Sequence, residues 1–334
     1  MAALASCDKA PEYEMTDHFN GKNFINPTLS EQISPGISDV VGMMREGRQT
    51  WPTNLPTTGV PQLAADLGRD RMAVTFVNHA TFLIQMPGIT ILTDPVWSER
   101  ASPVSCFGPK RVRSPGIALE KIPSLDVVLV SHNHYDHLDL TTLRRLHERF
   151  EPTFVVPLGN RALLESAGIK DVVELDWWQS VAAPSQVQIM LTPTQHSSGR
   201  GLFDRDKALW GSYFVKRGDR SLFFGGDGGY SSHFSDIRER LGPPEVALLG
   251  IGSYEPSWFM RPLHMNPAEA LVAHGDLEAG QSIGMHIGTF QLSSEAFDQP
   301  LTDLLSALRV SNSPPNSFTV MEEGETRFFP QISE

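Results

Sequence analysis

The feature that most constrains this chain is a run of histidines and aspartates directly after a short apolar stretch. Residues 126–130 have the composition of a buried β-strand. Four potential metal ligands then lie within six residues, namely His132, His134, Asp136 and His137. His132 and His134 are two residues apart, so an extended backbone points both to one side, whereas Asp136 and His137 follow a turn and can face a second ion. Imidazoles and carboxylates are suitable ligands for zinc and similar ions, so we expect a metal site where this strand ends.

Three further strand-like runs each lead into one more potential ligand. Residues 187–191, 221–224 and 282–285 are followed by His196, Asp227 and His286. Glycines flank Asp227 on both sides and let the backbone crowd around its carboxylate. A lone histidine or aspartate after a strand is more often structural, so each of these residues is weak evidence by itself. In this order after the first four, they indicate one site for two metal ions.

The composition argues against several other classes of function. The formal net charge of −12 argues against nucleic acid as a partner, because that binding needs a clustered positive field. No apolar run approaches the roughly 18 residues of a membrane-spanning helix. The chain has two cysteines, Cys7 and Cys106, so we expect neither a disulfide framework nor a cysteine-rich zinc site. Any metal must therefore be held by histidines and carboxylates.

Short β-rich runs and helical patterns alternate along most of the chain. Further strands are expected at 73–77, 81–85, 89–93, 153–156, 212–215 and 246–249, with a hairpin around Pro87. The helical patterns are clearest at 139–149, 160–167, 267–279 and 294–309, and Asn266 and Pro267 suit the N-cap and first turn of the third. The alternation favours one α/β domain over residues 71–334, with two sheet layers and helices outside. Residues 1–70 are punctuated by Asn, Gly, Pro and Thr, so we expect a leader that wraps this domain.

The residues around Cys7 leave the location of the protein open. Leu4-Ala5-Ser6-Cys7 resembles the lipobox of bacterial lipoproteins, but the segment before it is shorter than the apolar region of about 7–15 residues in a signal peptide. The match is either the end of a trimmed signal or a chance one. The first case predicts a periplasmic or membrane-tethered bacterial protein, and the second a cytoplasmic one.

The ordered set His-x-His-x-Asp-His, then His, Asp and His, resembles the metal signature of the metallo-β-lactamase superfamily. Within it, the chain is most similar to the N-acylphosphatidylethanolamine-hydrolysing phospholipase D family, over roughly residues 70–310. The motifs that carry this resemblance are NHATFLI at 78–84, LTDPVWSERASP at 92–103, GPKR at 108–111, SHNHYDHLD at 131–139, TPTQH at 192–196, LWGS at 209–212, YEPSWFM at 254–260 and HIGTF at 286–290.

The resemblance implies a fold, a metal site and an activity. The fold is an αββα sandwich of two mixed β-sheets flanked by helices. One zinc ion would be bound by His132, His134 and His196, a second by Asp136, His137 and His286, and Asp227 would bridge them; iron or manganese suits the same residue types. Two such ions assist hydrolysis of a phosphodiester by stabilising negative charge. The implied reaction releases phosphatidate and an N-acylethanolamine from an N-acylated phospholipid.

Two departures from the family's pattern bear on this expectation. The family usually has Thr after the bridging Asp, and this chain has Gly228. After His196 the family often carries bulky and basic residues, whereas here the sequence is Ser197-Ser198-Gly199-Arg200. The first change affects the residues that support Asp227, and the second affects recognition of the substrate.

Residues for substrate contact are less specific than the metal ligands. Trp258, Phe259 and Met260 are candidates for the wall of an apolar groove, with packing in a lid or core as the alternative. Lys110 and Arg111 are candidates for an anionic headgroup, although an exposed basic loop usually has no such role. Besides Asp136 and Asp227, His264 is a candidate catalytic residue, because it can contact the substrate phosphate.

Six other side chains have structural interpretations in the sequence. His79 is expected to form a structural hydrogen bond rather than bind metal. His18, His147, His233 and His274 are expected at the surface. Asp139 either orients a ligand or caps the helix that follows it.

Other functions remain compatible with the same ligands. A metal-dependent carbonyl hydrolase, such as an acyl-homoserine lactonase, an esterase or a β-lactamase, would use the same ions. A non-catalytic metal-binding or ligand-sensing protein is a different class, but a structural zinc site is closed and four-coordinate rather than binuclear. A lipid or acylated small molecule is the expected partner, and peripheral membrane contact and a homo-oligomer are both compatible with the sequence.

Overall fold

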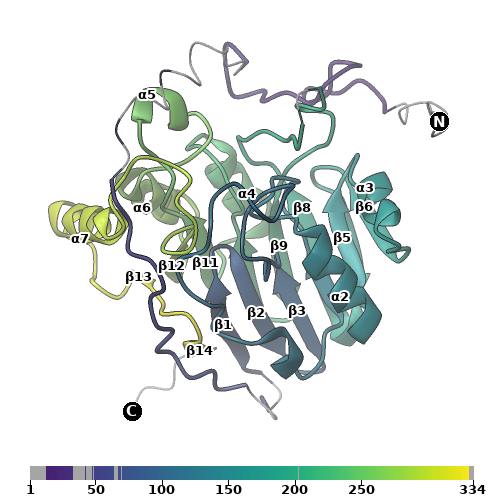
Figure 1. The fold of residues 1–334 in the computed structure, drawn as a ribbon, viewed down its shortest axis with the longest axis horizontal. Coiled ribbons are helices and arrows are strands. Elements are labelled where there is room, and N and C mark those ends of the chain that lie inside the picture. The colour runs from purple at the N-terminus through teal and green to yellow at the C-terminus, as the bar shows by residue number, and fades with distance from the viewer. Residues whose placement is uncertain are drawn as a thin grey trace.

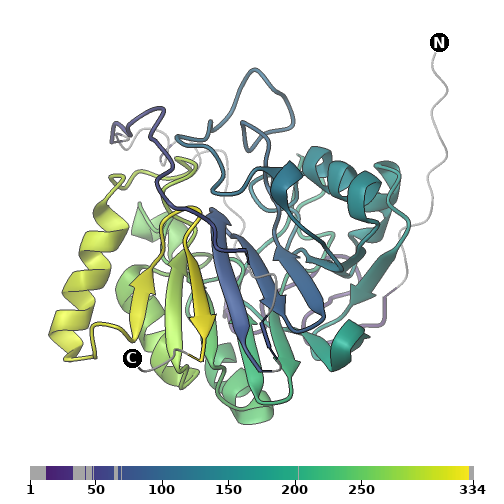
Figure 2. The ribbon, with the colours of Figure 1, turned by 90° about the horizontal axis from the view of Figure 1, so that it is seen from below.

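The computed structural model describes residues 13–32, 42, 47, 49–63, 67–68, 70–201 and 203–330. Within them the chain forms two seven-stranded sheets packed face to face, with helices outside (Figures 1 and 2). This arrangement confirms the expected αββα sandwich. None of the helices in these ranges is long and apolar enough to cross a membrane. Cys7 lies outside the described residues.

The first sheet is mixed. Its spatial order is β14 (Thr326–Phe329), β1 (Met72–Asn78), β2 (Thr81–Met86), β3 (Ile89–Thr93), β4 (Val127–Leu129), β5 (Thr153–Pro157) and β6 (Val172–Leu175). Strands β14 to β3 pair antiparallel, and β3 to β6 pair parallel. The β2–β3 connection is the hairpin expected around Pro87.

The second sheet is also mixed. Its spatial order is β13 (Phe318–Val320), β12 (Gln281–Met285), β11 (Val246–Gly250), β10 (Arg220–Phe224), β9 (Ser212–Arg217), β8 (Val187–Thr192) and β7 (Ser180–Ala183). Strands β7 to β10 pair antiparallel, and β10 to β13 pair parallel. Because β8 and β10 are both antiparallel to β9, they run in the same direction.

The alternation of side chains along the strands builds the layers. In β4, Val127 and Leu129 enter the core between the sheets, whereas Val128 packs with the outer cluster under the helices. Helices α2 (Leu140–Phe150) and α3 (Arg161–Ser166) cover the outer face of the first sheet. Helices α4 (His233–Leu241), α6 (Pro267–Asp276) and α7 (Gln299–Ser311) cover the second. Short helices are η1 (Leu119–Lys121), η2 (Pro184–Gln186) and α5 (Ser257–Met260).

The strands that the sequence patterns did not predict are the edges of the two sheets. These four strands are β6, β7, β13 and β14, and each has a neighbour on one side only. Their side chains are largely half-buried or exposed, so no continuous apolar run marks them. Helix α4 was also missed. Helix α7 begins at Gln299, five residues later than expected, with Pro300 in its first turn.

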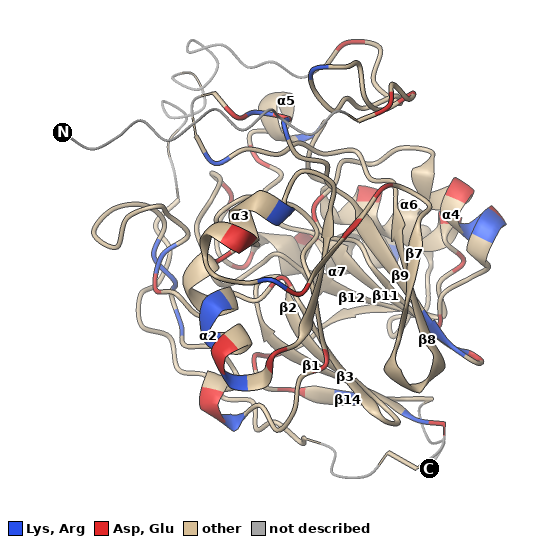
Figure 3. Cartoon of the chain, turned by 90° about the vertical axis from the view of Figure 1, so that its right-hand side faces the viewer, with Lys and Arg blue, Asp and Glu red and all other residues tan. Residues whose placement is uncertain are grey.

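The described parts of the leader lie on the sandwich. Residues 49–63 run beside the first sheet, where the Leu55 N–H donates to the Val112 carbonyl at 2.7 Å (Figure 1). Residues 13–32 insert Phe19 and Phe24 into the core between the sheets. The division of the chain at residue 70 stays a prediction. On the side shown in Figure 3, basic and acidic residues alternate along α2, α3 and α4.

Candidate metal centre

The loop with four potential ligands is fixed at both ends. It leaves β4 and turns where the His137 N–H donates to the His134 carbonyl at 3.1 Å. It then enters α2, where the Asp139 carboxylate accepts hydrogen bonds from the N–H groups of Thr141 and Thr142. Asp139 therefore caps the helix, the second of its two expected roles.

The other potential ligands also follow the carboxyl ends of strands. His196 follows β8, Asp227 follows β10 and His286 follows β12. Because β8, β10 and β12 run in the same direction, their carboxyl ends lie at the same end of the second sheet. The structure brings all seven predicted metal ligands together at this end of the strands.

The first three histidines form a compact group. The Nε2 atom of His132 lies 2.8 Å from Nδ1 of His134, which lies 3.3 Å from Nε2 of His196. The rings of His132 and His196 are almost fully buried, whereas His134 is half-buried. The three nitrogens are close enough together to bind one cation.

A second group forms beside the first. The Oδ2 atom of Asp136 lies 3.2 Å from Nε2 of His137 and 3.1 Å from Nε2 of His286. The Oδ2 atom of Asp227 is 3.1 Å from the same two nitrogens. It is also 4.0 Å from His132 Nε2 and 3.9 Å from His196 Nε2. Asp227 therefore lies between the two groups.

The chemistry of the cluster fits divalent cations. Burial opposes the charged form of the Asp227 carboxyl, but the nearby imidazoles of His137 and His286 outweigh it and hold its pKa well below the usual range. The Oδ1 atom of Asp227 is buried and has no hydrogen-bond partner among the described residues. Buried polar atoms normally have partners, so this donor set is suited to ions.

Two buried side chains outside the predicted ligands hold members of the cluster. The Oδ2 atom of Asp94 lies 2.6 Å from Nδ1 of His137 and 2.6 Å from the Ser131 hydroxyl. The Nε2 atom of His79 lies 2.9 Å from Oδ2 of Asp136. Burial lowers the pKa of His79 to about 3, so its imidazole is neutral and donates to the carboxylate. The expected structural hydrogen bond of His79 is thus made to the candidate ligand Asp136.

Asp94 lies in the LTDPVWSERASP motif at 92–103, but the sequence patterns did not predict a role for it. It follows β3, which is the parallel neighbour of β4. Carboxyl ends of adjacent parallel strands lie side by side, so an aspartate after β3 must lie beside the loop that follows β4. The pairing of β3 with β4 could therefore have predicted that Asp94 lies beside the candidate ligands.

His264 joins the cluster from the segment before α6. Its Nδ1 atom lies 3.8 Å from Oδ2 of Asp227, and its ring centre is 5.2 Å from that of His196. Burial lowers the pKa of His264 to about 4, so its imidazole is neutral. The structure thus places this candidate catalytic residue beside the candidate ligands.

The candidate substrate residues differ in their exposure to solvent. Trp258 is 54% exposed on α5, whereas Met260 is buried. Lys110 is exposed near Glu99. The Arg111 guanidinium donates to the carbonyls of Ser98 and Val96 at 2.9 and 3.0 Å. Arg111 therefore holds its own loop, and a headgroup contact by any of these residues stays a prediction.

The expectation of four surface histidines was wrong for two of them. His18 and His233 are 7% and 3% exposed. His18 is buried because both ring nitrogens meet carboxylates, those of Asp17 and Asp176. His233 is buried at the start of α4, with its ring 3.9 Å from Phe234. His147 and His274 are half-buried.

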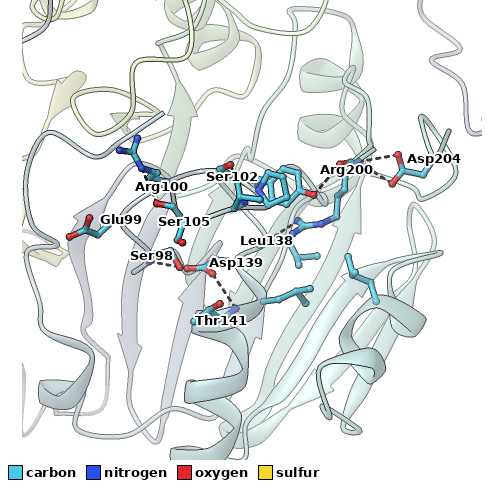
Figure 4. Close-up of a pocket in the computed structure, with 15 residues that line it drawn as sticks. Ser98, Glu99, Arg100, Ser102, Ser105, Leu138, Asp139, Thr141, Arg200 and Asp204 are labelled. Atoms are coloured by element: carbon cyan, nitrogen blue, oxygen red, sulfur yellow. Dashed lines mark hydrogen bonds between the residues drawn. The ribbon is translucent and has the colours of Figure 1, made fainter. Parts of the chain in front are cut away.

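The stretch after His196 forms a wall beside the ligand loop. The guanidinium of Arg200 stacks on the Tyr135 ring at 3.9 Å and donates to the carbonyls of Asn133 and Leu138. A cavity of about 890 Å³, lined by Tyr135 and Arg200, extends to Ser102 and Asp204 (Figure 4). A second hollow of about 250 Å³, lined by the same two residues, reaches His134.

The position of Gly228 leaves little room for a side chain. A Cβ atom at position 228 would lie 2.3 Å from the hydroxyl oxygen of Thr194. That hydroxyl donates to the Asp227 carbonyl at 3.3 Å. Thr194 therefore occupies the space that a side chain at position 228 would need.

Comparisons with known proteins show the family and the fold of this chain. A family model described as a β-lactamase superfamily domain matches residues 90–287. N-acyl-phosphatidylethanolamine-hydrolyzing phospholipase D 1 of Caenorhabditis elegans is 36% identical over 331 residues, which cover 92% of each chain. The mitochondrial enzyme of the same name from Saccharomyces cerevisiae is 40% identical over 219 residues, 64% of this chain and 47% of that protein. Igni18, a metallo hydrolase from Ignicoccus hospitalis, has a similar fold, with a TM-score of 0.58, 22% identity and coverage of 79% of this chain and 100% of that one.

Proposed function

Because this chain belongs to the β-lactamase superfamily, and within it to the N-acyl-phosphatidylethanolamine-hydrolysing phospholipase D-like family, we propose that it is a two-metal phosphodiesterase for N-acylated phospholipids. The chain is a metal-dependent hydrolase, as its relatives are named. Zinc as the ion, the number of ions and the phospholipid substrate are parts of the proposal.

The position of Asp227 carries the proposal. Its Oδ2 atom lies between two groups of ligand atoms, at 3.1 Å from one group and about 4 Å from the other. A single carboxylate placed in this way suits a bridge between two ions. A closed structural site would use four ligands around one ion instead.

Each group has the ligands for one ion. The first ion would be held by His132, His134 and His196, and the second by Asp136, His137 and His286, with Asp227 bridging. These nitrogen and oxygen ligands suit zinc, iron or manganese. When bound, two such ions supply Lewis acidity and lower the pKa of water, as hydrolysis of a phosphodiester needs.

The protein's own residues would orient the reacting groups. His264 is neutral and lies beside Asp227, so it can donate a hydrogen bond to a phosphate oxygen. His134 is half-buried and borders the hollow beside Tyr135 and Arg200, which gives a substrate a route to the cluster. Water would be added across one P–O bond, and the products would be phosphatidate and an N-acylethanolamine.

The proposal is tested with two substrates in one mixture, one with a phosphodiester bond and one with a lactone bond. The zinc-loaded protein is incubated with equal amounts of an N-acylated phosphatidylethanolamine and a long-chain acyl-homoserine lactone, and the products are identified by mass spectrometry. We expect phosphatidate and N-acylethanolamine from the wild type and none from His134→Ala. His147→Ala is the matched control, because this histidine is half-buried on α2 and absent from the cluster.

Other products would contradict the substrate assignment. Ring-opened lactone beside intact phospholipid would identify a carbonyl hydrolase with the same metal site. No product from either compound, with two ions bound per chain, would identify a metal-binding protein without this catalytic activity.

A further inference from the structure

The leader segment 13–32 reaches the candidate metal centre. Its Phe24 side chain is 2% exposed in the core between the sheets, and the Phe24 N–H donates to the Asp206 carbonyl at 2.8 Å. The Asn23 carboxamide donates to the Arg205 carbonyl at 3.1 Å. This part of the leader is therefore anchored to the stretch that follows His196.

Asn26 makes the contact with a candidate ligand itself. Its side chain is 4% exposed, and its carboxamide pairs with both backbone groups of His196. The Nδ2 atom donates to the His196 carbonyl at 2.7 Å, and the His196 N–H donates to Oδ1 at 3.0 Å. The pair resembles two adjacent hydrogen bonds between strands, although neither residue belongs to a strand.

The backbone of His196 depends on this pair. Strand β8 ends at Thr192, four residues before His196, and the last backbone bridge before His196 joins Gln195 to Gly229. Among the described residues, the N–H and carbonyl of His196 have no hydrogen-bond partner other than Asn26. The His196 ring also donates from Nδ1 to the Leu263 carbonyl at 2.9 Å. Nε2 then faces His134.

Asn26 is itself held by a second side-chain amide. The Gln32 carboxamide accepts from the Asn26 N–H and donates to the Asn26 carbonyl, both at 2.8 Å. Beside this pair, the Thr28 hydroxyl donates to Oε1 of Gln195 at 2.7 Å. The contact is thus one part of a connected set in which every carboxamide has a partner at short distance.

We propose that Asn26 is a positioning residue of the metal centre, which fixes the backbone of His196 so that its imidazole reaches the first ion. The inference rests on the proposed metal site. It makes residues 13–32 a part of the functional site, although they lie outside the matched domain at 90–287. The side chain of Asn26 does not contact the ions or the substrate in this role.

The test measures metal affinity directly. Zinc dissociation constants of the full chain are determined by chelator competition, and the bound-cobalt absorption spectrum is recorded. We expect Asn26→Ala to weaken the binding of one of the two ions by about 10–100-fold, because loss of a ligand's hydrogen-bond partner typically has an effect of this size. The absorption spectrum of bound cobalt should also change. The second ion should keep its affinity.

Asn23→Ala is the matched control. It removes another carboxamide contact between the same segment and the stretch after His196, but it leaves His196 untouched. It should bind both ions as the wild type does. Asn26→Asp keeps the size of the side chain and the acceptor for the His196 N–H, so it should give an intermediate affinity even if Asn26→Ala does not fold.

The outcomes separate the inference from the proposed function. A wild type that binds fewer than two ions contradicts the two-metal site itself. A wild type with two ions, together with a folded Asn26→Ala or Asn26→Asp of unchanged affinity and cobalt spectrum, contradicts only the role of Asn26. An equal loss in Asn23→Ala also overturns it, because the effect would then come from the segment as a whole.

Discussion

Hydrogen bonds from residues outside the ligand set hold the candidate ligands in place. Asp94 accepts from His137, His79 donates to Asp136, and Asn26 pairs with the backbone of His196. All three partners are buried. Since a ligand that rotates freely binds an ion weakly, these partners determine how well the cluster is preorganised. Gly228 acts by its lack of a side chain, which leaves space for the Thr194 hydroxyl.

We predict that Gly228→Ala destabilises the protein and that Thr194→Ala relieves the effect. The new Cβ would lie 2.3 Å from the Thr194 hydroxyl oxygen but 3.6 Å from the Thr194 Cβ, which is ordinary contact. Overpacking of this kind costs about 1–3 kcal/mol. The free energies of unfolding of both single variants and the double variant, measured in urea, give the coupling between the positions.

The matched control for this pair is Gly275→Ala, since a Cβ there meets no atom within 4 Å. That substitution should leave the stability unchanged or raise it slightly, as Gly to Ala does within a helix. Additive effects of Gly228→Ala and Thr194→Ala would show that the two side chains do not compete for space.

Among the elements, segment 13–32 is attached to the sandwich at a junction between the sheets. His18 stacks on Trp177 with ring centres 4.4 Å apart, and its Nε2 lies 2.8 Å from Asp176. These two partners lie between β6 of the first sheet and β7 of the second. Burial lowers the pKa of His18, but hydrogen bonds to Asp176 and Asp17 outweigh it, so the pKa is raised above 6.5.

This attachment predicts a pH dependence of stability. A folded-state pKa above the unfolded value means that the contribution of His18 is fully present below about pH 6.5. It is lost as the pH rises through the raised pKa. The difference in Tm between the wild type and His18→Gln should therefore be largest near pH 5.5 and smaller at alkaline pH.

The measurement is a series of thermal melts in matched buffers. His147→Gln is a suitable control, because this histidine lies on α2 and no ion pair between it and a carboxylate is found among the described residues. A Tm difference that stays constant with pH would mean that the charge of His18 does not stabilise the segment.

For the molecule as a whole, the site joins the two sheets. His132 to His137 follow a strand of the first sheet, and His196, Asp227 and His286 follow strands of the second. Ions bound between them would link the two halves of the sandwich. Since unfolding separates these ligands, bound metal favours the folded state.

Removal of metal should therefore lower the stability of the whole chain. An ion present at 100 times its dissociation constant stabilises the folded state by about 2.7 kcal/mol. We expect the Tm to fall in EDTA and to recover when zinc is restored. The Tm of Asp227→Asn should change less between EDTA and zinc, because the substitution weakens the carboxylate contact that both ions would share. An identical Tm with EDTA and with zinc would contradict a shared site.

The sequence by itself determined the central strands of both sheets and the set of candidate ligands. Central strands such as β4 are buried on both faces, so an apolar run marks them, and the metal-binding residue types directly after them mark the site. The capping box of α6 at Asn266 was also local, because Asn266 and Glu269 are three residues apart. Such features need only neighbours along the chain.

Tertiary structure alone decided the rest. Edge strands β6, β7, β13 and β14 exist because a neighbouring strand offers unpaired backbone groups, and their own side chains carry little pattern. Asn26 reaches His196 across 170 residues, and His18 reaches Asp176 across 158. No local pattern records such contacts, since a polar side chain in a Gly- and Pro-punctuated leader looks solvated until the fold buries it against its partner.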